Sequence, residues 1–296
     1  MAAKVPLAVR KELRDSWETT IPGHESKLTE ILGTPWKIDI DAQAIYRVGG
    51  HDSPGYMLNK YLEATTDNLK DFVNKFGEDG KQELNHVATA HTITMDETED
   101  PGISYCGCDI HEGKLRILFA KTYFATNIYQ ATYPDTLQAA LNKAGNSSAS
   151  LNFNVRSGIK SDWDPKIEDL KKRLQKIIGV DELTITPNFE ANFSALDGKP
   201  GLDRDWDKAL GSRTLTYFEG LADNLVQAGF DKDDMLQEGL QEAFEKKEIK
   251  FEVVSKLSKG TYNETLPEDG VLVIRTNPEN YNVNTHQVGY GLVDLL

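Results

Sequence analysis

Cysteine is scarce in this chain, whose 296 residues include only Cys106 and Cys108. With two cysteines there is no disulfide framework, so packed apolar side chains must hold the fold together. Apolar residues make up 39% of the chain and charged residues 27%, which is typical of globular rather than disordered proteins. The length allows one large domain or two domains of about 150 residues each.

Long apolar runs are also missing, and no segment approaches the run of about 20 residues that spans a bilayer. Lys4, Arg10, Lys11 and Arg14 interrupt the N-terminal segment, so it lacks the apolar core of a signal peptide. We therefore expect a soluble, cytoplasmic protein without membrane contact. The net charge of −14 opposes binding to a phosphate backbone, so we expect no nucleic-acid partner.

Several signatures of enzyme chemistry are absent as well. The chain contains no Gly-x-x-x-x-Gly-Lys-Ser/Thr phosphate loop and no Gly-x-Gly-x-x-Gly dinucleotide fingerprint. It also lacks the Gly-x-Ser-x-Gly nucleophile elbow and the His-Glu-x-x-His metal motif. We accordingly expect no cofactor.

What the chain does contain is a repeat. YLEATTDNL at residues 61–69 returns as YFEGLADNL at residues 217–225, with five identities in nine positions. Other identities follow in the same order at nearly constant spacing, as a duplicated unit requires. They include Trp17 with Trp163, Gly33 with Gly179, Asn127 with Asn284, and Gln130 with Gln287.

The repeat divides the chain into a first unit at residues 1–143 and a second unit at residues 151–296. Residues 144–150, AGNSSAS, are small, polar and rich in turn formers, which is typical of a linker. The second unit contains about ten more residues than the first. We expect them in a surface loop after Gly201, where insertions are tolerated.

The expected order of elements within one unit is about β-α-β-α-α-β-β. VPLAV at residues 5–9 and LNFNV at residues 151–155 alternate apolar residues, which predicts a strand at the start of each unit. A helix follows and should end at Gly33 or Gly179, with Asp164 as the N-cap in the second unit. PWKIDIDAQAIY and ELTITPNFEANF then predict a strand or hairpin before the helix of the repeated motif.

Two apolar strands close each unit, HTITMDE with KLRILFA and EIKFEVV with VLVIRTN. Consecutive strands at the end of the unit, after earlier helices, suggest an α+β fold with helices over one sheet face. The sequence thus predicts a tandem duplication of a unit of about 140 residues, with helices packed on a mostly antiparallel sheet. We expect the two copies to pack about a pseudo-twofold axis, as in an isologous dimer.

The repeated helix places two carboxylates one turn apart on the face away from its apolar stripe. Like charges at this spacing repel, so a partner is expected unless both are simply solvated. That partner is an ion pair with Arg10 or Arg156, a contact between repeats, or a bound cation. The carboxylates concerned are Glu63, Asp67, Glu219 and Asp223.

A second repeated polar pattern follows the last strand of each unit, as FATNIYQ and YNVNTHQ. Its amides either satisfy backbone groups in a loop or bind a polar ligand at the end of the sheet. The amide residues are Asn127, Gln130, Asn284 and Gln287.

The first unit alone contains CGCDIH, which groups Cys106, Cys108 and His111 in an expected loop. Thiolates and imidazole are zinc or copper ligands, although no second ligand pair follows at a recognised spacing. The alternatives are a nucleophilic cysteine paired with His91 or His111, or ordinary loop residues.

These patterns predict a non-enzymatic ligand-binding or interaction protein with its site in the cleft between the repeats. The partner would be a small polar ligand or a protein, and the protein a monomer with an internal pseudo-dimer or a homodimer. The alternative is a cofactor-independent acid–base enzyme, a hydrolase or isomerase, confined to the first repeat. Its catalytic candidates are His51, Asp52 and His91.

Overall fold

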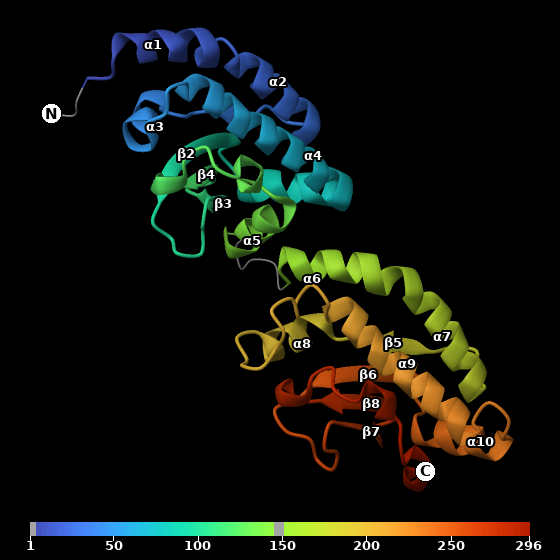
Figure 1. Ribbon diagram of the computed structural model, residues 1–296. Helices are drawn as coiled ribbons and strands as arrows, with labels where there is room; N and C mark the ends of the chain where they lie inside the picture. The colour runs from blue at the N-terminus through green and yellow to red at the C-terminus, as the bar shows by residue number, and fades with distance from the viewer. Residues whose placement is uncertain (1–3, 145–150) are drawn as a thin grey trace. The chain divides into compact units, whose positions relative to one another are not determined.

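The computed structural model describes residues 4–144 and 151–296, and the chain forms two compact units, Met1–Asn146 and Ser147–Leu296. Both units run through a similar order of elements (Figure 1). Unit 1 contains α1 (Leu7–Leu13), the π-helix η1 (Arg14–Glu18), α2 (Ile21–Leu32), β1 (Lys37–Ile38), α3 (Ala42–Gly49), α4 (Pro54–Val87), β2 (Thr92–Thr98), β3 (Cys106–His111), β4 (Lys114–Ala120), the 3-10 helices η2 (Lys121–Tyr123) and η3 (Ile128–Gln130), and α5 (Pro134–Ala144).

Unit 2 repeats most of this order with small differences. Its elements are α6 (Phe153–Gly158), the π-helix η4 (Ile159–Trp163), α7 (Asp164–Ile178), β5 (Thr184–Thr186), α8 (Phe189–Leu196), α9 (Leu210–Ala228), α10 (Asp234–Ala243), β6 (Glu248–Val253), β7 (Asn263–Glu268), β8 (Val271–Thr276), and the 3-10 helices η5 (Pro278–Asn280), η6 (Thr285–Gln287) and η7 (Leu292–Leu295). Gly77, with φ 59° and ψ −144°, divides α4 into two helices that correspond to α9 and α10.

Each unit contains one four-stranded sheet, in the order β1-β2-β4-β3 or β5-β6-β8-β7. The first three strands of each sheet are parallel, and only the last pair is antiparallel. The predicted mostly antiparallel sheet was therefore wrong. The two predicted closing strands, β2 and β4 or β6 and β8, are neighbours as expected, but they run parallel. The antiparallel partner of β4 or β8 is a further strand, β3 or β7, which forms a hairpin with it on its other edge.

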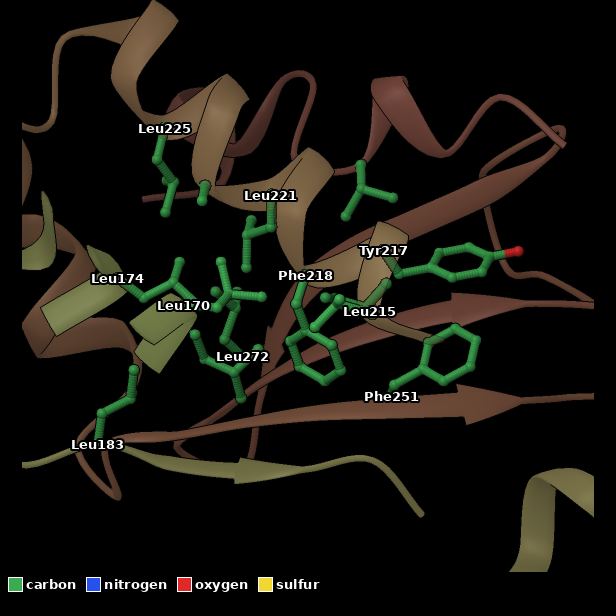
Figure 2. Close-up of a cluster of buried hydrophobic side chains, with 14 of the residues drawn as sticks. Leu170, Leu174, Leu183, Leu215, Tyr217, Phe218, Leu221, Leu225, Phe251 and Leu272 are labelled. Atoms are coloured by element: carbon green, nitrogen blue, oxygen red, sulfur yellow. The ribbon is translucent and has the colours of Figure 1, made fainter. Parts of the chain in front are cut away.

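The α+β class is confirmed, since helices pack on both sheets. In unit 2, apolar side chains from α7, α9 and the sheet meet in one cluster that includes Leu174, Phe218 and Leu272 (Figure 2). The rings of Tyr217 and Phe251 join α9 to β6 at a centroid distance of 4.4 Å. Each fully buried side chain of this size contributes about 1.5–3 kcal/mol, so the helix–sheet core dominates the stability of the unit.

The repeated tryptophans and glycines occupy equivalent structural positions. Trp17 and Trp163 are both buried in the π-helical segment of their unit. Gly33 and Gly179 end α2 and α7 in the left-handed region, with φ of 73° and 76°, as predicted. Asp164 is not an N-cap, because α7 continues directly from η4 and the residue before Asp164 is already helical.

The predicted strands at the start of each unit are helices instead. VPLAV enters α1, and LNFNV enters α6, whose N-cap Asn152 accepts a hydrogen bond from the Val155 amide at 2.9 Å. A few alternating apolar residues cannot distinguish a strand from a short buried helix. The Asn152 cap favours the helix in unit 2, whereas α1 of unit 1 begins without a side-chain cap. The next segments pair as strands only at Lys37–Ile38 and Thr184–Thr186 before α3 and α8 begin.

The additional residues of unit 2 lie between α8 and α9, at residues 197–209, where unit 1 has only residues 50–53. Of the predicted linker, Ala144 ends α5 and residues 145–150 lie outside the described part. The pseudo-twofold axis and the cleft between repeats stay predictions. No described helix is long and apolar enough to cross a membrane.

Candidate functional site

The repeated tyrosine of the helix motif is a structural anchor. Tyr61 and Tyr217 are fully buried. The Tyr61 hydroxyl accepts a hydrogen bond from the Ala125 amide at 3.2 Å, and the Tyr217 hydroxyl accepts one from the Asn282 amide at 2.7 Å. Burial raises the pKa of both phenols, so they stay protonated at neutral pH.

The repeated asparagine of the same motif holds the same loop one step further along. Asn68 donates to the Tyr129 carbonyl oxygen, and Asn224 to the His286 carbonyl oxygen, at 2.7 Å in both units. The Asn224 amide also donates to the Val288 carbonyl oxygen at 2.7 Å. The tyrosine and the asparagine of the repeated motif therefore bind the main helix of each unit, α4 or α9, to the loop after its last strand, β4 or β8.

Asn127 and Asn284 have the same left-handed backbone, with φ 50° and ψ 40°. Asparagine tolerates this conformation better than most residues, which explains the repeated identity. A side chain from the edge strand contacts each of them. The Cys106 thiol donates to the Asn127 carbonyl oxygen at 3.1 Å, and the Asn263 amide donates to the Asn284 carbonyl oxygen at 3.0 Å.

We call residues 124–133 and 281–290, held by these contacts, the clamped loops of units 1 and 2. Within each clamped loop the backbone N–H of the glutamine, Gln130 or Gln287, donates to the carbonyl oxygen of the left-handed asparagine at 2.9 Å. Three residues after each glutamine stands a tyrosine, Tyr133 or Tyr290, whose exposed fractions are 50% and 59%. The anchoring tyrosines Tyr61 and Tyr217 are fully buried, whereas Tyr133 and Tyr290 expose about half of their surface to solvent.

An open cleft lies beside the clamped loop of unit 1, with a volume of about 480 Å³. It is formed by the segment before β3, the start of β3, η3 and the start of α5. None of its lining residues carries a charge, although the chain has a net charge of −14. The lining residues are Gly102, Ile103, Ser104, Cys106, Gly107, Tyr129, Gln130, Tyr133 and Thr136.

The repeated carboxylates of the main helix are solvent exposed, as the helical periodicity indicated. Glu63 forms an ion pair with Lys60 at 2.6 Å, and Asp223 forms one with Arg173 at 2.7 Å. These partners differ from the predicted arginines, and exposed pairs of this kind contribute at most about 1 kcal/mol. Asp67 and Glu219 are likewise exposed, and Asp67 does not line the uncharged cleft of its own unit.

The segment CGCDIH is strand β3 rather than a loop, because it forms a hairpin with β4. Side chains alternate between the faces of a strand, so Cys106 and Cys108 share one face and His111 lies on the other. Burial raises the pKa of Cys106 to about 11 and also raises that of Cys108. Among residues 4–144 and 151–296, no three His, Cys, Asp or Glu side chains are grouped for a metal ion.

The predicted catalytic residues occupy different places in unit 1. The Nδ1 atom of His51 accepts a hydrogen bond from the Ser53 amide at 3.1 Å, and Asp52 beside it is exposed. His91 follows α4, packs against Trp36 at 5.7 Å, and contacts the Asn85 carbonyl oxygen through Nε2 at 3.1 Å.

His111 lines a second cleft of about 330 Å³, on the sheet face opposite to the cysteines. Its charged groups are largely paired with one another: Lys114 contacts Asp39 at 3.3 Å, and Arg116 contacts Asp96 at 3.5 Å. Neither cleft contains His51, Asp52 or His91, so these clefts do not unite the acid–base candidates.

A part-buried polar cluster in unit 1 had no sequence signal. The Asn59 side-chain oxygen accepts a hydrogen bond from the Thr20 hydroxyl at 2.6 Å and contacts His24 Nε2 at 3.0 Å. His24 is 7% exposed, and its Nδ1 atom has no hydrogen-bond partner. By the spacing of the repeat, the positions of His24 and Asn59 correspond to Leu170 and Leu215 in unit 2, which both belong to the apolar core.

Sequence reasoning found Gln130 and Gln287 but missed the tyrosines beside them. Tyr133 and Tyr290 lie at the same spacing as the matched asparagines and glutamines, so the repeat itself contained the signal. No protein-family model, curated protein or solved structure matches the chain. The clamped loops and the uncharged cleft are therefore the basis for a functional assignment.

Proposed function

We propose that the chain is a non-enzymatic binding protein that arose by duplication of one unit and presents a tyrosine and a glutamine from each clamped loop to a protein partner. The supporting observation is the contrast between the repeated residues. The buried ones, Tyr61, Asn68 and Asn127 with their counterparts, support the backbone. The side chains of Tyr133 and Tyr290 are at least half exposed, and their hydroxyl groups form no hydrogen bond with the described residues, so a surface role best accounts for their repetition.

A rigid support favours binding because less conformational entropy is lost when the partner docks. Each clamped loop is fixed by bonds from the main helix, from the edge strand and within itself. Tyrosine brings a large amphipathic surface with few rotatable bonds, which is why it is enriched at interfaces. The clamped loops thus combine a stiff backbone with suitable contact side chains.

The cleft of unit 1 indicates the kind of partner. Its lining offers two half-exposed tyrosines, one amide and two hydroxyl residues, with no charge to pair. An uncharged lining excludes water from a charged ligand group without compensating it, so a charged group there is disfavoured. We therefore assign the cleft to an extended, uncharged segment of a protein, whose side chains pack on the tyrosines while its backbone bonds to Gln130.

Selection of peptides tests this function. A random 12-residue peptide library displayed on phage is selected on the immobilised full chain, and the peptides are then measured against variants. Tyr133→Ala combined with Tyr290→Ala should weaken the selected peptides at least about tenfold, the size of effect common for interface tyrosines. Tyr56→Ala is the matched control, because Tyr56 is 55% exposed and unit 2 has Ser212 at the corresponding position of its main helix.

Peptides that bind the double variant as tightly as the unchanged chain would refute the proposal. The same conclusion follows if no peptide is selected, or if Tyr56→Ala weakens binding as much as the double substitution does. Circular dichroism of each variant confirms that the fold is retained, as expected for exposed side chains.

A further inference from the structure

Two residues beside the cleft of unit 1 exchange their sizes in unit 2. Gly107 corresponds to Glu264, because each is the second residue of its edge strand, β3 or β7. By the spacing of the repeat, Ile103 in the segment before β3 corresponds to Gly260 in the segment before β7. The strand position is therefore small and the loop position large in unit 1, whereas unit 2 has the reverse.

Both pairs make one contact from opposite sides. A Cβ atom at Gly107 would lie 3.3 Å from the Cδ1 atom of Ile103, so the isoleucine side chain lies over the glycine. A Cβ atom at Gly260 would lie 3.2 Å from the Cβ atom of Glu264, so in unit 2 the strand residue lies over the loop glycine. Both distances are shorter than an ordinary contact of 3.4–4 Å, so the place between strand and loop holds one side chain.

The backbone of unit 1 does not require glycine at position 107. Its φ lies outside the left-handed region that favours glycine. Glycine within a strand commonly marks a place that another group approaches closely, and here that group is the Ile103 side chain. Gly107 thus allows Ile103 to form part of the wall of the cleft.

The side chains that occupy this place differ in chemistry. Ile103 is part-buried and lines the uncharged cleft of unit 1. Glu264 is 8% exposed, and its carboxylate accepts hydrogen bonds from the backbone N–H groups of Ser258 and Lys259, both at 2.9 Å. An apolar group that packs well on an isoleucine would meet a fixed carboxylate in unit 2, and it would cover that carboxylate without pairing it.

We infer that Ile103, lying over Gly107, determines the specificity of the cleft by contacting an apolar side chain of the bound segment, and that Glu264 bars such a side chain from the corresponding place in unit 2. This contact presupposes the proposed function, because a peptide segment must occupy the cleft of unit 1. Among the described residues that line the cleft, Ile103 has the one aliphatic side chain. Its branched Cβ restricts rotation, so little conformational entropy is lost on contact.

Variants that exchange the pair test this role with the tightest peptide from the selection described above. Ile103→Gly combined with Gly107→Glu gives unit 1 the residues of unit 2, and it should weaken that peptide at least about tenfold. Ile103→Ala introduces no charge and keeps Gly107. It should weaken the peptide about fivefold, which corresponds to little more than one buried methylene group.

His111→Glu is the matched control for the added carboxylate. His111 is exposed, belongs to the same strand β3, and does not line the uncharged cleft. This substitution should leave the affinity unchanged. Circular dichroism and the melting temperature of each variant show whether the fold is retained, and Ile103→Ala provides the result if the double variant unfolds.

Alanine substitutions in the peptide distinguish a direct contact from a structural role of Ile103. One apolar peptide residue should contribute to binding of the unchanged chain but contribute nothing further once Ile103 is alanine, which is the signature of a shared contact in a double-mutant cycle. A merely structural role would give independent losses for every peptide residue, and this would overturn the inferred contact.

The outcomes also separate this contact from the proposed function. Peptides that bind both Ile103 variants as tightly as the unchanged chain, but lose affinity when Tyr133 and Tyr290 are alanine, overturn the role of Ile103 and leave the binding function intact. Equal weakening by His111→Glu and by the double variant also overturns it. Peptides that ignore Ile103 and both tyrosines overturn both proposals.

Discussion

The clamp between the main helix and the loop can be tested most directly at Asn224. This side chain is 7% exposed and donates two hydrogen bonds of 2.7 Å, to the carbonyl oxygens of His286 and Val288. Asn224→Leu keeps the approximate size of the side chain but removes both donors. The carbonyl group of Val288 then loses its donor in a buried place, and that of His286 loses its donor in a part-buried place.

The cost follows from the number of bonds lost. A buried polar group left unsatisfied costs about 1–3 kcal/mol. Because the bond to His286 is only part-buried, its carbonyl group can regain water, and we expect a total loss of about 2–4 kcal/mol in the free energy of unfolding. Asn68→Leu in unit 1 removes one short bond of 2.7 Å and a contact of 3.5 Å to the Thr132 hydroxyl. We expect it to cost about 1–2 kcal/mol, less than the substitution in unit 2.

Amide hydrogen exchange measured by mass spectrometry distinguishes the two units. Asn224→Leu should speed exchange in β8 about 30-fold to 1,000-fold, and leave β4 of unit 1 unchanged because its core is separate. Glu219→Gln is the control, since Glu219 is exposed on the same helix and should change stability by less than about 0.5 kcal/mol. If Asn224→Leu costs no more than this control, the clamp does not stabilise the loop.

Three further predictions concern buried or strained residues. His24→Leu or Asn59→Leu alone should destabilise unit 1 by about 1–3 kcal/mol in urea unfolding. The double variant, which has the leucines of unit 2 at both positions, should restore or exceed the original stability. Losses of the two single variants that simply add in the double variant would contradict this. Burial raises the pKa of the Cys106 thiol to about 11, so roughly one part in a thousand should be thiolate at pH 8. The thiol should therefore react slowly with iodoacetamide, at a rate that rises as the pH approaches 11. Rapid labelling at pH 8, measured by mass spectrometry, would contradict this. Asn284→Val should cost about 1–2 kcal/mol because φ is 50°, whereas Asn284→Gly should cost little, and equal melting temperatures would refute this.

The repeat in the sequence predicted the correspondence between the units better than it predicted their elements. Gly33 and Gly179 could be placed because a helix that ends in the left-handed region favours glycine, a local rule independent of tertiary contacts. The first element of each unit depended instead on whether an alternating segment meets a sheet or another helix. Here tertiary packing decided, and the Asn152 cap was the only local sign of a helix.

The relative direction of the strands could not be predicted from their apolar pattern. Strands with alternating apolar residues and strands with continuous apolar runs occur in both parallel and antiparallel pairs. A sharper signal was present in unit 2. Asp269-Gly270, with φ of 51° and 77°, forms the two-residue turn between β7 and β8, and Asp-Gly is a strong hairpin sequence. That turn makes β7 the antiparallel partner of β8, which leaves β6 to pair on the other edge of β8, parallel to it.

The candidate site could be predicted only in part, because sequence identity between two halves does not distinguish residues kept for folding from residues kept for binding. Burial and hydrogen bonding separate these groups. Asn127 and Asn284 are explained by their backbone angles, and the anchoring tyrosines by the amides that they hold. Substitution of an exposed side chain usually changes stability by less than about 0.5 kcal/mol. Stability therefore does not explain an exposed tyrosine at both positions when its side chain holds no backbone group. Tyr133 and Tyr290 meet that criterion, and this is the reason why we propose that these half-exposed rings contact a partner.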